Sequence, residues 1–403
     1  MISTPAHDRL RYVVVIPSYD EPGLILCLKS LYECISTLYP VEVIVVINSN
    51  ESEAEEKKLS YEQTFREATG WAREHSTPHK TFHILHVVDL PDKSGGVGLA
   101  RKIGMDEAAR RLGNDGVILC LDADCTVAKN YLAVVEEHFL EHPTSPGCSI
   151  YFEHPLEGPY DDTIYSGITR YELFLRYYVQ AQRYSGFPYA YQTVGSSMAA
   201  RAGVYKKQGG MNTKKAGEDF YFLSKIIPLG NFTEVRRTTV YPSPRTSLRV
   251  PFGTGKAMID WQKNKEILTY PTGVFVELKD LFSHADTLYK LPGTRLTSFL
   301  KTLGDCMRSF LLDNDFDTAL DSINGKSTTL PVFRKHFFHW FNGFRIMKFA
   351  HFACSAFYSR GPIVEEAFTL LGIISPSVKV KKEAKDLLEV YREIDKGTLI
   401  IER

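Results

Sequence analysis

Four short apolar runs in the first 121 residues constrain the fold of this chain more than any other feature. They are YVVVI (12–16), VEVIVVI (41–47), a run from Phe82 to Val88, and GVILCL (116–121). Short runs rich in valine and isoleucine are typical of strands that are buried on both faces. Helical periodicity separates the runs, most clearly at about 97–112. This alternation predicts an α/β fold with a mostly parallel sheet and helices on both faces.

Polar residues follow three of these predicted strands directly. Ser18 to Glu21 follow the first strand, Asn48 to Asn50 the second, and Asp122 with Asp124 the fourth. Ligands of parallel sheets bind beyond the carboxyl ends of the strands. We therefore expect these residues to share one rim of a crevice.

The most informative strand end is the pair Asp122 and Asp124 in ILCLDADC. Two carboxylates this close repel each other unless a cation or hydrogen-bond donors offset their charge. Oxygen ligands suit Mg²⁺ or Mn²⁺, and Mg²⁺ commonly takes one or two protein carboxylates together with substrate phosphate oxygens. The pair predicts a metal-bound diphosphate, with Asp122 and Asp124 as metal ligands. The alternative is that Asp124 caps a helix near Lys129, since aspartate is a good N-cap.

Charge and cysteine content narrow the class of protein. The 403 residues carry 48 basic and 48 acidic side chains. Generic nucleic-acid binders usually have a basic surplus, so we expect no nucleic-acid partner. The seven cysteines form no C-x-x-C pair, a pattern typical of free thiols in a reducing cytosol. Neither a secretory leader nor a run of eighteen apolar residues is found, so we expect a cytoplasmic protein.

The order of motifs along the chain resembles that of family 2 glycosyltransferases with the GT-A fold. These motifs are IPSYDEP, VIVVINSN, GGVGLARKIGMDEA, LDADC, GSSMAARAGVYKKQGG and AGEDFYFLSKI, between about residues 10 and 260. The resemblance implies a Rossmann-like GT-A domain that transfers a sugar from a nucleotide diphosphate to an acceptor hydroxyl. It also implies that Asp122 and Asp124 bind a divalent metal, Mn²⁺ or Mg²⁺, on that diphosphate.

The pair Glu218–Asp219 matches the position of the catalytic base in inverting family members. A base is required to take the proton from the acceptor hydroxyl as it attacks the anomeric carbon. Glu218 beside Asp219 would raise the pKa of one of the two carboxyls. The structural alternative is that both residues only favour a helix N-terminus.

Donor contacts are expected along the predicted rim. Arg101 follows a glycine-rich loop that opens a helix, and the amides of such a helix end attract phosphate. The loop meets neither the dinucleotide nor the P-loop fingerprint. The arginines of SPRTSLRVPFGTG suit the charge of a departing diphosphate. The expected nucleotide-sugar contacts are Pro17, Tyr19, Glu21, Asn48, Gly98, Arg101, Asp122, Arg245 and Arg249.

The second predicted strand departs from the family pattern. Family members often end this strand in two aspartates, one of which holds a uracil ring, whereas this chain has Ile47-Asn48-Ser49-Asn50. An asparagine side chain offers both a hydrogen-bond donor and an acceptor. Both a UDP-sugar and a GDP-sugar therefore stay open as donors. The Q-x-x-R-W motif of processive membrane members is absent, so we expect a non-processive enzyme.

Residues beyond about 275 are helical in period and lack strand signals. We expect a GT-A catalytic domain at 1–270 and a helical region at 271–403. The stretch from Phe333 to Arg360 mixes aromatic and basic residues. We favour an aromatic helix packed on the catalytic domain. The alternative is a peripheral membrane contact through an in-plane helix, at the inner face of the membrane, that reaches a lipid-linked acceptor.

Together these features predict a metal-dependent, inverting, non-processive glycosyltransferase, hexosyltransferase-like and of class EC 2.4. The acceptor could be a glycan, a lipid-linked molecule or a small molecule. A nucleotidyltransferase is one alternative, but VVVIPSYDEPG lacks the usual glycine-rich phosphate loop. A non-catalytic nucleotide-sugar-binding module is another, and the intact Asp122, Asp124 and Asp219 count against it.

Overall fold

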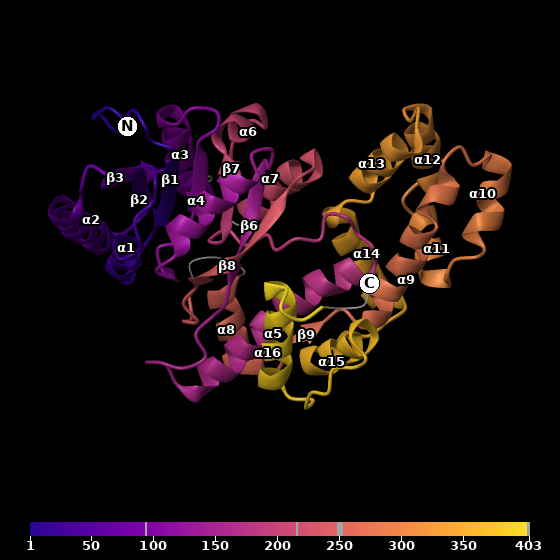
Figure 1. The fold of residues 1–403 in the computed structure, drawn as a ribbon. Coiled ribbons are helices and arrows are strands. Elements are labelled where there is room, and N and C mark those ends of the chain that lie inside the picture. The colour runs from indigo at the N-terminus through magenta and orange to yellow at the C-terminus, as the bar shows by residue number, and fades with distance from the viewer. Residues whose placement is uncertain (93–94, 215–216, 248–252, 401–403) are drawn as a thin grey trace. The chain divides into compact units, whose positions relative to one another are not determined.

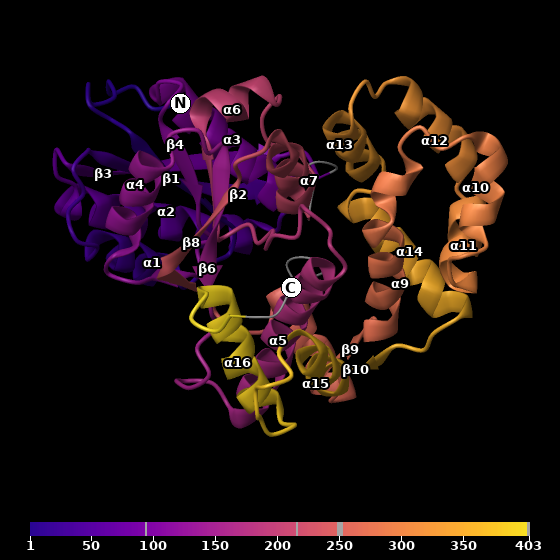
Figure 2. The same ribbon diagram turned by 45° about the vertical axis from the view of Figure 1, so that its right-hand side comes forward.

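A computed structural model describes residues 1–92, 95–214, 217–247 and 253–400. The chain forms two compact units (Figures 1 and 2). The first, which we call the sheet unit, comprises residues 1–168 and 193–259. The second, the helical unit, comprises residues 169–192 and 260–403. The functional boundary expected from the sequence, 1–270 and 271–403, stays a prediction.

The sheet unit contains an eight-stranded sheet in the order β3-β2-β1-β4-β7-β6-β8-β5. Neighbouring strands from β3 to β4 are parallel, as are β6 and β8, whereas β7 is antiparallel to both its neighbours and β5 is antiparallel to β8. This topology confirms the expected mostly parallel α/β fold. The strands are β1 (Tyr12–Ser18), β2 (Val41–Asn50), β3 (Lys80–Leu90), β4 (Val117–Cys120), β5 (Thr126–Val127), β6 (Gly147–Phe152), β7 (Met198–Arg201) and β8 (Thr233–Tyr241).

Helices cover both faces of the parallel half of the sheet (Figure 1). The chain passes from β1 to β2 to β3 in one direction and then returns across the sheet to β4. Because such crossovers are right-handed, the first two connecting helices share one face and the third lies on the other. These helices are α1 (Leu24–Tyr32), α2 (Glu55–His75) and α3 (Val97–Arg111).

The remaining helices of the sheet unit follow the D-x-D motif. They are α4 (Tyr131–Glu141), α6 (Ala202–Lys207), α7 (Glu218–Ile226) and η1 (Ile227–Leu229); α5 (Asp162–Tyr184) and α8 (Thr254–Asn264) begin in this unit and end in the other. The N-cap of α4 is Asn130, and β5 separates that helix from Asp124. Asp124 therefore does not cap α4, which removes the structural alternative for its presence.

The helical unit is built from the elements that follow residue 260 and from the second part of α5 (Figure 2). These elements are β9 (Leu268–Thr269), α9 (Thr272–Ser283), η2 (Ala285–Leu288), α10 (Gly293–Leu300), α11 (Asp305–Leu312), α12 (Phe316–Gly325), α13 (Leu330–Trp340), α14 (Gly343–Ala356), β10 (Gly361–Pro362), α15 (Ile363–Ile374) and α16 (Ala384–Lys396). The two-residue strands β9 and β10 pair with each other and were not expected from the helical period of this region.

Aromatic side chains fill the interior of the helical unit. Phe333, Phe337 and Phe349 are fully buried in α13 and α14. The apolar faces of these two helices thus serve as core. In the part of the chain that the structure describes, no helix combines the length and the apolar character that a membrane crossing needs. All seven cysteines are free thiols, as expected.

A buried charge cluster joins α5 to α16 within the helical unit. The Arg176 guanidinium donates to Glu172 Oε1 at 2.8 Å and to Asp395 Oδ2 at 2.5 Å. Arg392 donates to both oxygens of Glu172, at 2.7 and 2.9 Å, and Gln180 donates to Asp395 at 2.6 Å. Because these charges are buried, their pairing specifies where the C-terminal helix packs along α5.

Arg176→Met should destabilise the chain, since the buried carboxylates of Glu172 and Asp395 both lose the guanidinium that they share, although Arg392 and Gln180 still bind them. Breaking a buried pair in this way typically costs about 3–5 kcal/mol of unfolding free energy. Arg237→Met is the matched control, because Arg237 pairs with Glu137 at the surface and such pairs contribute about 1 kcal/mol or less. Urea unfolding of both variants measures the difference. Equal stability losses would contradict the assigned role of the cluster.

Candidate active site

Polar strand ends meet at one edge of the sheet, as the sequence predicted. The register places Ser18 beside Ile47, and β4 ends at Cys120 beside Val15. The loop after β1 then folds against the D-x-D motif. There the Cys27 thiol, in α1, donates to the Asp122 carbonyl at 3.7 Å.

Three carboxylates concentrate negative charge at this edge. The side chains of Asp122 and Asp124 are 39% and 28% exposed, and Glu21 is buried. Burial, reinforced by the charges of Asp122 and Glu21, raises the pKa of Asp124 to about 7. The Arg245 side chain offsets part of this charge, because it donates to Glu21 and lies 4.0 Å from Asp124 Oδ2.

The excess of negative charge fits a divalent cation at Asp122 and Asp124. The oxygen donors are of the kind that Mg²⁺ and Mn²⁺ prefer. Across the described residues, no group of three or more His, Cys, Asp or Glu side chains is arranged to hold a metal by itself. The two aspartates would therefore supply part of a coordination shell that water and phosphate oxygens complete.

Arg101 links the D-x-D motif to the Glu218–Asp219 pair. Its side chain, on α3, is 2% exposed and donates to Asp122 Oδ1 at 2.8 Å, to Glu218 Oε1 at 3.1 Å and to the Gly195 carbonyl at 3.0 Å. Burial disfavours the charge, but the two carboxylates outweigh it and hold the pKa of Arg101 above its ordinary value. The guanidinium thus joins α3, the end of β4 and the start of α7 in one charge network.

The adjacent residues Glu218 and Asp219 have different environments. Glu218 is buried against Arg101, whereas Asp219 is partly exposed and accepts a hydrogen bond from the Phe220 amide at 2.7 Å. Burial and the neighbouring Glu218 raise the pKa of Asp219 to about 6, although Arg101 opposes the shift. Both residues lie in the first turn of α7, so the helix-terminus alternative holds alongside a chemical role.

Two glycines allow close approaches around this network. A Cβ atom at Gly195 would lie 2.9 Å from Arg101 Nη2 and 3.0 Å from Asp219 Oδ2. A Cβ atom at Gly98 would lie 2.0 Å from the Lys214 carbonyl oxygen. Gly98 therefore has a packing reason in addition to the donor contact expected of it. Gly195 was not singled out in the sequence, where nothing indicates that it lies beside Arg101.

The remaining expected donor residues differ in their surroundings. Asn48 is 1% exposed, and among the described residues neither of its amide atoms has a hydrogen-bond partner. An unsatisfied buried amide typically costs about 1–3 kcal/mol, which a ligand with a donor and an acceptor would offset. Pro17 is buried within β1, while Tyr19 is partly exposed just beyond that strand. Arg249 lies outside the described residues.

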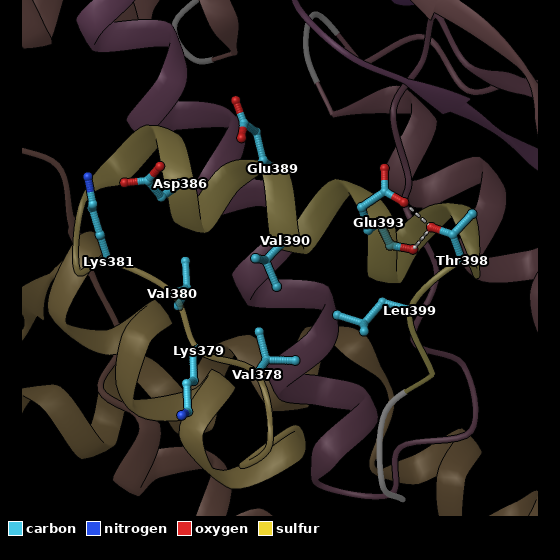
Figure 3. Close-up of a pocket in the computed structure, with 10 residues that line it drawn as sticks. All are labelled: Val378, Lys379, Val380, Lys381, Asp386, Glu389, Val390, Glu393, Thr398 and Leu399. Carbon is cyan, nitrogen blue, oxygen red and sulfur yellow. Dashed lines mark hydrogen bonds between the residues drawn. The ribbon is translucent and has the colours of Figure 1, made fainter.

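A separate hollow of about 570 Å³ lies beside α16 in the helical unit (Figure 3). Val378, Val380, Val390 and Leu399 line it, with lysine and glutamate side chains around them. Its lining residues all come from 378–399, so it contains none of the residues expected to carry chemistry.

Arg101→Met should raise the pKa of Asp219 above about 6, because the nearby positive charge that stabilises its carboxylate is lost. Arg111→Met is the control, since Arg111 is also buried in α3 but pairs with Glu42. Carboxyl-carbon NMR titration measures the pKa of Asp219 in each of the two variants. An unchanged Asp219 pKa in Arg101→Met would show that the two groups are not coupled.

Comparisons with known proteins give a family match for the N-terminal part of the chain. Residues 13–193 match the family described as glycosyl transferase family 2, a match that ends before Glu218 and Asp219. No curated protein sequence matches this chain.

Solved structures give distant similarities. TarS 1–349 of S. aureus in complex with UDP-GlcNAc is 14% identical over 82% of this chain and 92% of its own, with a TM-score of 0.40. The mannosyltransferase PcManGT of Pyrobaculum calidifontis, in complex with GDP-Man and Mn²⁺, is 15% identical over 98% of this chain and 88% of its own, with a TM-score of 0.38. The family match over residues 13–193 confirms the resemblance to family 2 glycosyltransferases seen in the motifs.

Proposed function

We propose that this chain is a metal-dependent glycosyltransferase of class EC 2.4 that moves a sugar from a nucleotide diphosphate to an acceptor hydroxyl. We further propose that transfer inverts the anomeric carbon and occurs once per encounter. The observation that carries the proposal is the Arg101 network. In this network one guanidinium donates both to Asp122 of the D-x-D motif, which is suited to a metal diphosphate, and to Glu218, the neighbour of Asp219. A group for the leaving diphosphate and a group for the acceptor proton therefore share one site.

Asp122 and Asp124 are the residues we assign to Mg²⁺ or Mn²⁺. When bound, the ion would neutralise charge on the leaving diphosphate. The protein's own contribution here is the orientation of the carboxylates. Arg101 holds Asp122 Oδ1, while the negative charges of Asp122 and Glu21 beside Asp124 favour the approach of a cation.

Asp219 is the residue we assign as the base. Its Oδ1 atom accepts the Phe220 amide hydrogen bond, so we assign the acceptor proton to Oδ2, the oxygen that faces Gly195. The attacking hydroxyl oxygen forms the new bond to the anomeric carbon while its proton passes to Asp219 and the diphosphate departs. Glu218 stays paired with Arg101 and helps to raise the pKa of Asp219.

The donor is proposed to lie along the strand ends. Asn48 and Tyr19 would contact the base, and the amides at the start of α3 would face the phosphates. Arg245 and Arg249 are assigned to the departing diphosphate. Both UDP- and GDP-sugars stay open as donors, and glycan, lipid-linked and small-molecule acceptors all stay open. The catalytic boundary at residue 270, the cytoplasmic location and a peripheral membrane contact also stay proposals.

A panel of nucleotide sugars tests the function directly. With Mn²⁺ present, we expect one donor to bind and to be hydrolysed slowly without acceptor, and chelation of the metal should abolish both. If no donor binds, the proposed function is wrong. Binding without turnover on any acceptor would instead favour a non-catalytic module.

Asp219→Asn should slow transfer by about 10²–10⁴-fold, the usual contribution of a general base. Donor affinity should stay near that of the wild type, since the amide is close in shape to the carboxyl group. Asp317→Asn, at an exposed position in α12, is the control and should leave kcat unchanged. Retained turnover in Asp219→Asn would reject the base assignment.

The rate of transfer should depend on pH through Asp219. Its pKa is raised to about 6, so the carboxyl group is ionised and active above that pH and is protonated below it. We expect kcat/KM to fall by about tenfold per pH unit below 6. A profile of kcat/KM between pH 4.5 and 8 measures this, and a flat profile from pH 5 to 7 would exclude Asp219 as the titrating base.

A further inference from the structure

Glu53 connects the loop after β1 to the loop after β2. One carboxylate oxygen accepts a hydrogen bond from the Tyr19 hydroxyl, and the other accepts one from the Tyr61 hydroxyl at 3.0 Å. Tyr19 follows β1, Glu53 lies in the turn after β2, and Tyr61 projects from α2. Because β1 and β2 are neighbouring parallel strands, these contacts hold together two loops at the carboxyl edge of the sheet.

The environment of Glu53 favours a rigid contact. Its side chain is 8% exposed, and the Lys57 ammonium, on a side chain that is 57% exposed, lies 3.9 Å away. An ion pair with so exposed a lysine stabilises a carboxylate weakly. Both phenol hydroxyls donate to this carboxylate, and hydrogen bonds to an ionised acceptor are shorter and stronger than neutral ones.

The two tyrosines bind different oxygens of the Glu53 carboxylate. Tyr61 is 1% exposed, so its hydroxyl is held in place by the packing of α2. The rings of Tyr19 and Tyr61 lie 5.7 Å apart at an angle of 35°. Burial and the bond to Glu53 raise the pKa of Tyr19 to about 12, so its hydroxyl stays a donor at any physiological pH.

Asn48 is expected to lie near the Tyr19 ring at the edge of the sheet. The register pairs Ser18 with Ile47, the residues that come directly before Tyr19, just beyond β1, and Asn48, within β2. The Asn48 amide is buried, and within the described residues it has no hydrogen-bond partner. A partly exposed aromatic ring beside an unsatisfied amide suits a planar heterocycle that stacks on the ring and exchanges hydrogen bonds with the amide.

We infer that Glu53 is a positioning residue for the donor: through its bond to the Tyr19 hydroxyl it holds that ring beside Asn48 to receive the nucleobase. This inference rests on the proposed function, and it adds a residue that nothing in the local sequence marks. Glu53 itself does not contact the donor. Its effect should therefore appear in the binding of nucleosides and not in the binding of the diphosphate alone.

Calorimetry with three probes tests the inference: UDP, GDP and inorganic diphosphate, each with Mn²⁺. Glu53→Ala should lower the affinity for whichever nucleoside diphosphate the wild type binds by about tenfold. This is the loss expected when a hydrogen bond to a charged group is removed. Affinity for inorganic diphosphate should change by less than about twofold, since that probe does not reach the base subsite. Equal losses for all probes, or no loss for any, would overturn the inference.

Three further variants separate positioning from charge and from stability. Glu56→Ala removes an exposed carboxylate nearby on α2 and should bind like the wild type. Tyr19→Phe keeps the ring but loses the bond, so it should match Glu53→Ala, and the double variant should lose no more than either single one. Glu53→Gln keeps an acceptor oxygen for Tyr19 and should bind within about threefold of the wild type.

The outcomes distinguish a failure of this inference from a failure of the proposed function on which it rests. A wild-type chain that binds neither UDP nor GDP overturns the proposed function and the inference together. A wild-type chain that binds one of them, with Tyr19→Phe binding equally well, overturns the inference alone. That second comparison holds even if Glu53→Ala fails to fold, because Tyr19→Phe alters only one partly exposed hydroxyl.

Discussion

The buried guanidinium of Arg101 is the interaction on which the rest of the site depends. It takes a positive charge out of water, which is favourable only because Asp122, Glu218 and the Gly195 carbonyl all accept from it. Those three acceptors belong to different parts of the sheet unit. One side chain therefore sets the spacing between the end of β4, the segment before β7 and the first turn of α7.

The carboxylates of this network have different environments. Arg101 neutralises Glu218 and orients Asp122, whereas Asp219 and Asp124 have raised pKa values. Burial and neighbouring negative charge therefore raise the proton affinity of Asp124 and Asp219, the residues that we propose to help hold the cation and to take the proton. Arg245, paired with Glu21, completes the charge compensation on the far side of Asp124.

Local pattern was enough to predict the parallel half of the sheet and the strand end at Asp122 and Asp124. The runs are short, β-branched and bounded by polar residues, so both their state and their ends are visible in the sequence. The antiparallel β7 was harder to see, because its residues Met198–Arg201 include two alanines, which have low strand propensity. The pair β9–β10 was missed because two residues carry no periodicity.

The sequence by itself determined which residue types stand at the strand ends: carboxylates after β4, an amide in the last residues of β2 and an acidic pair at the start of α7. The tertiary structure alone decided their partners. Arg101 was expected to face the nucleotide, and the structure shows its guanidinium buried between Asp122 and Glu218. Nothing in the sequence indicated that Glu53 would accept hydrogen bonds from Tyr19 and Tyr61. The physical reason is that burial and pairing set the energy of a charge, and both depend on groups that are distant in sequence and brought together only by folding.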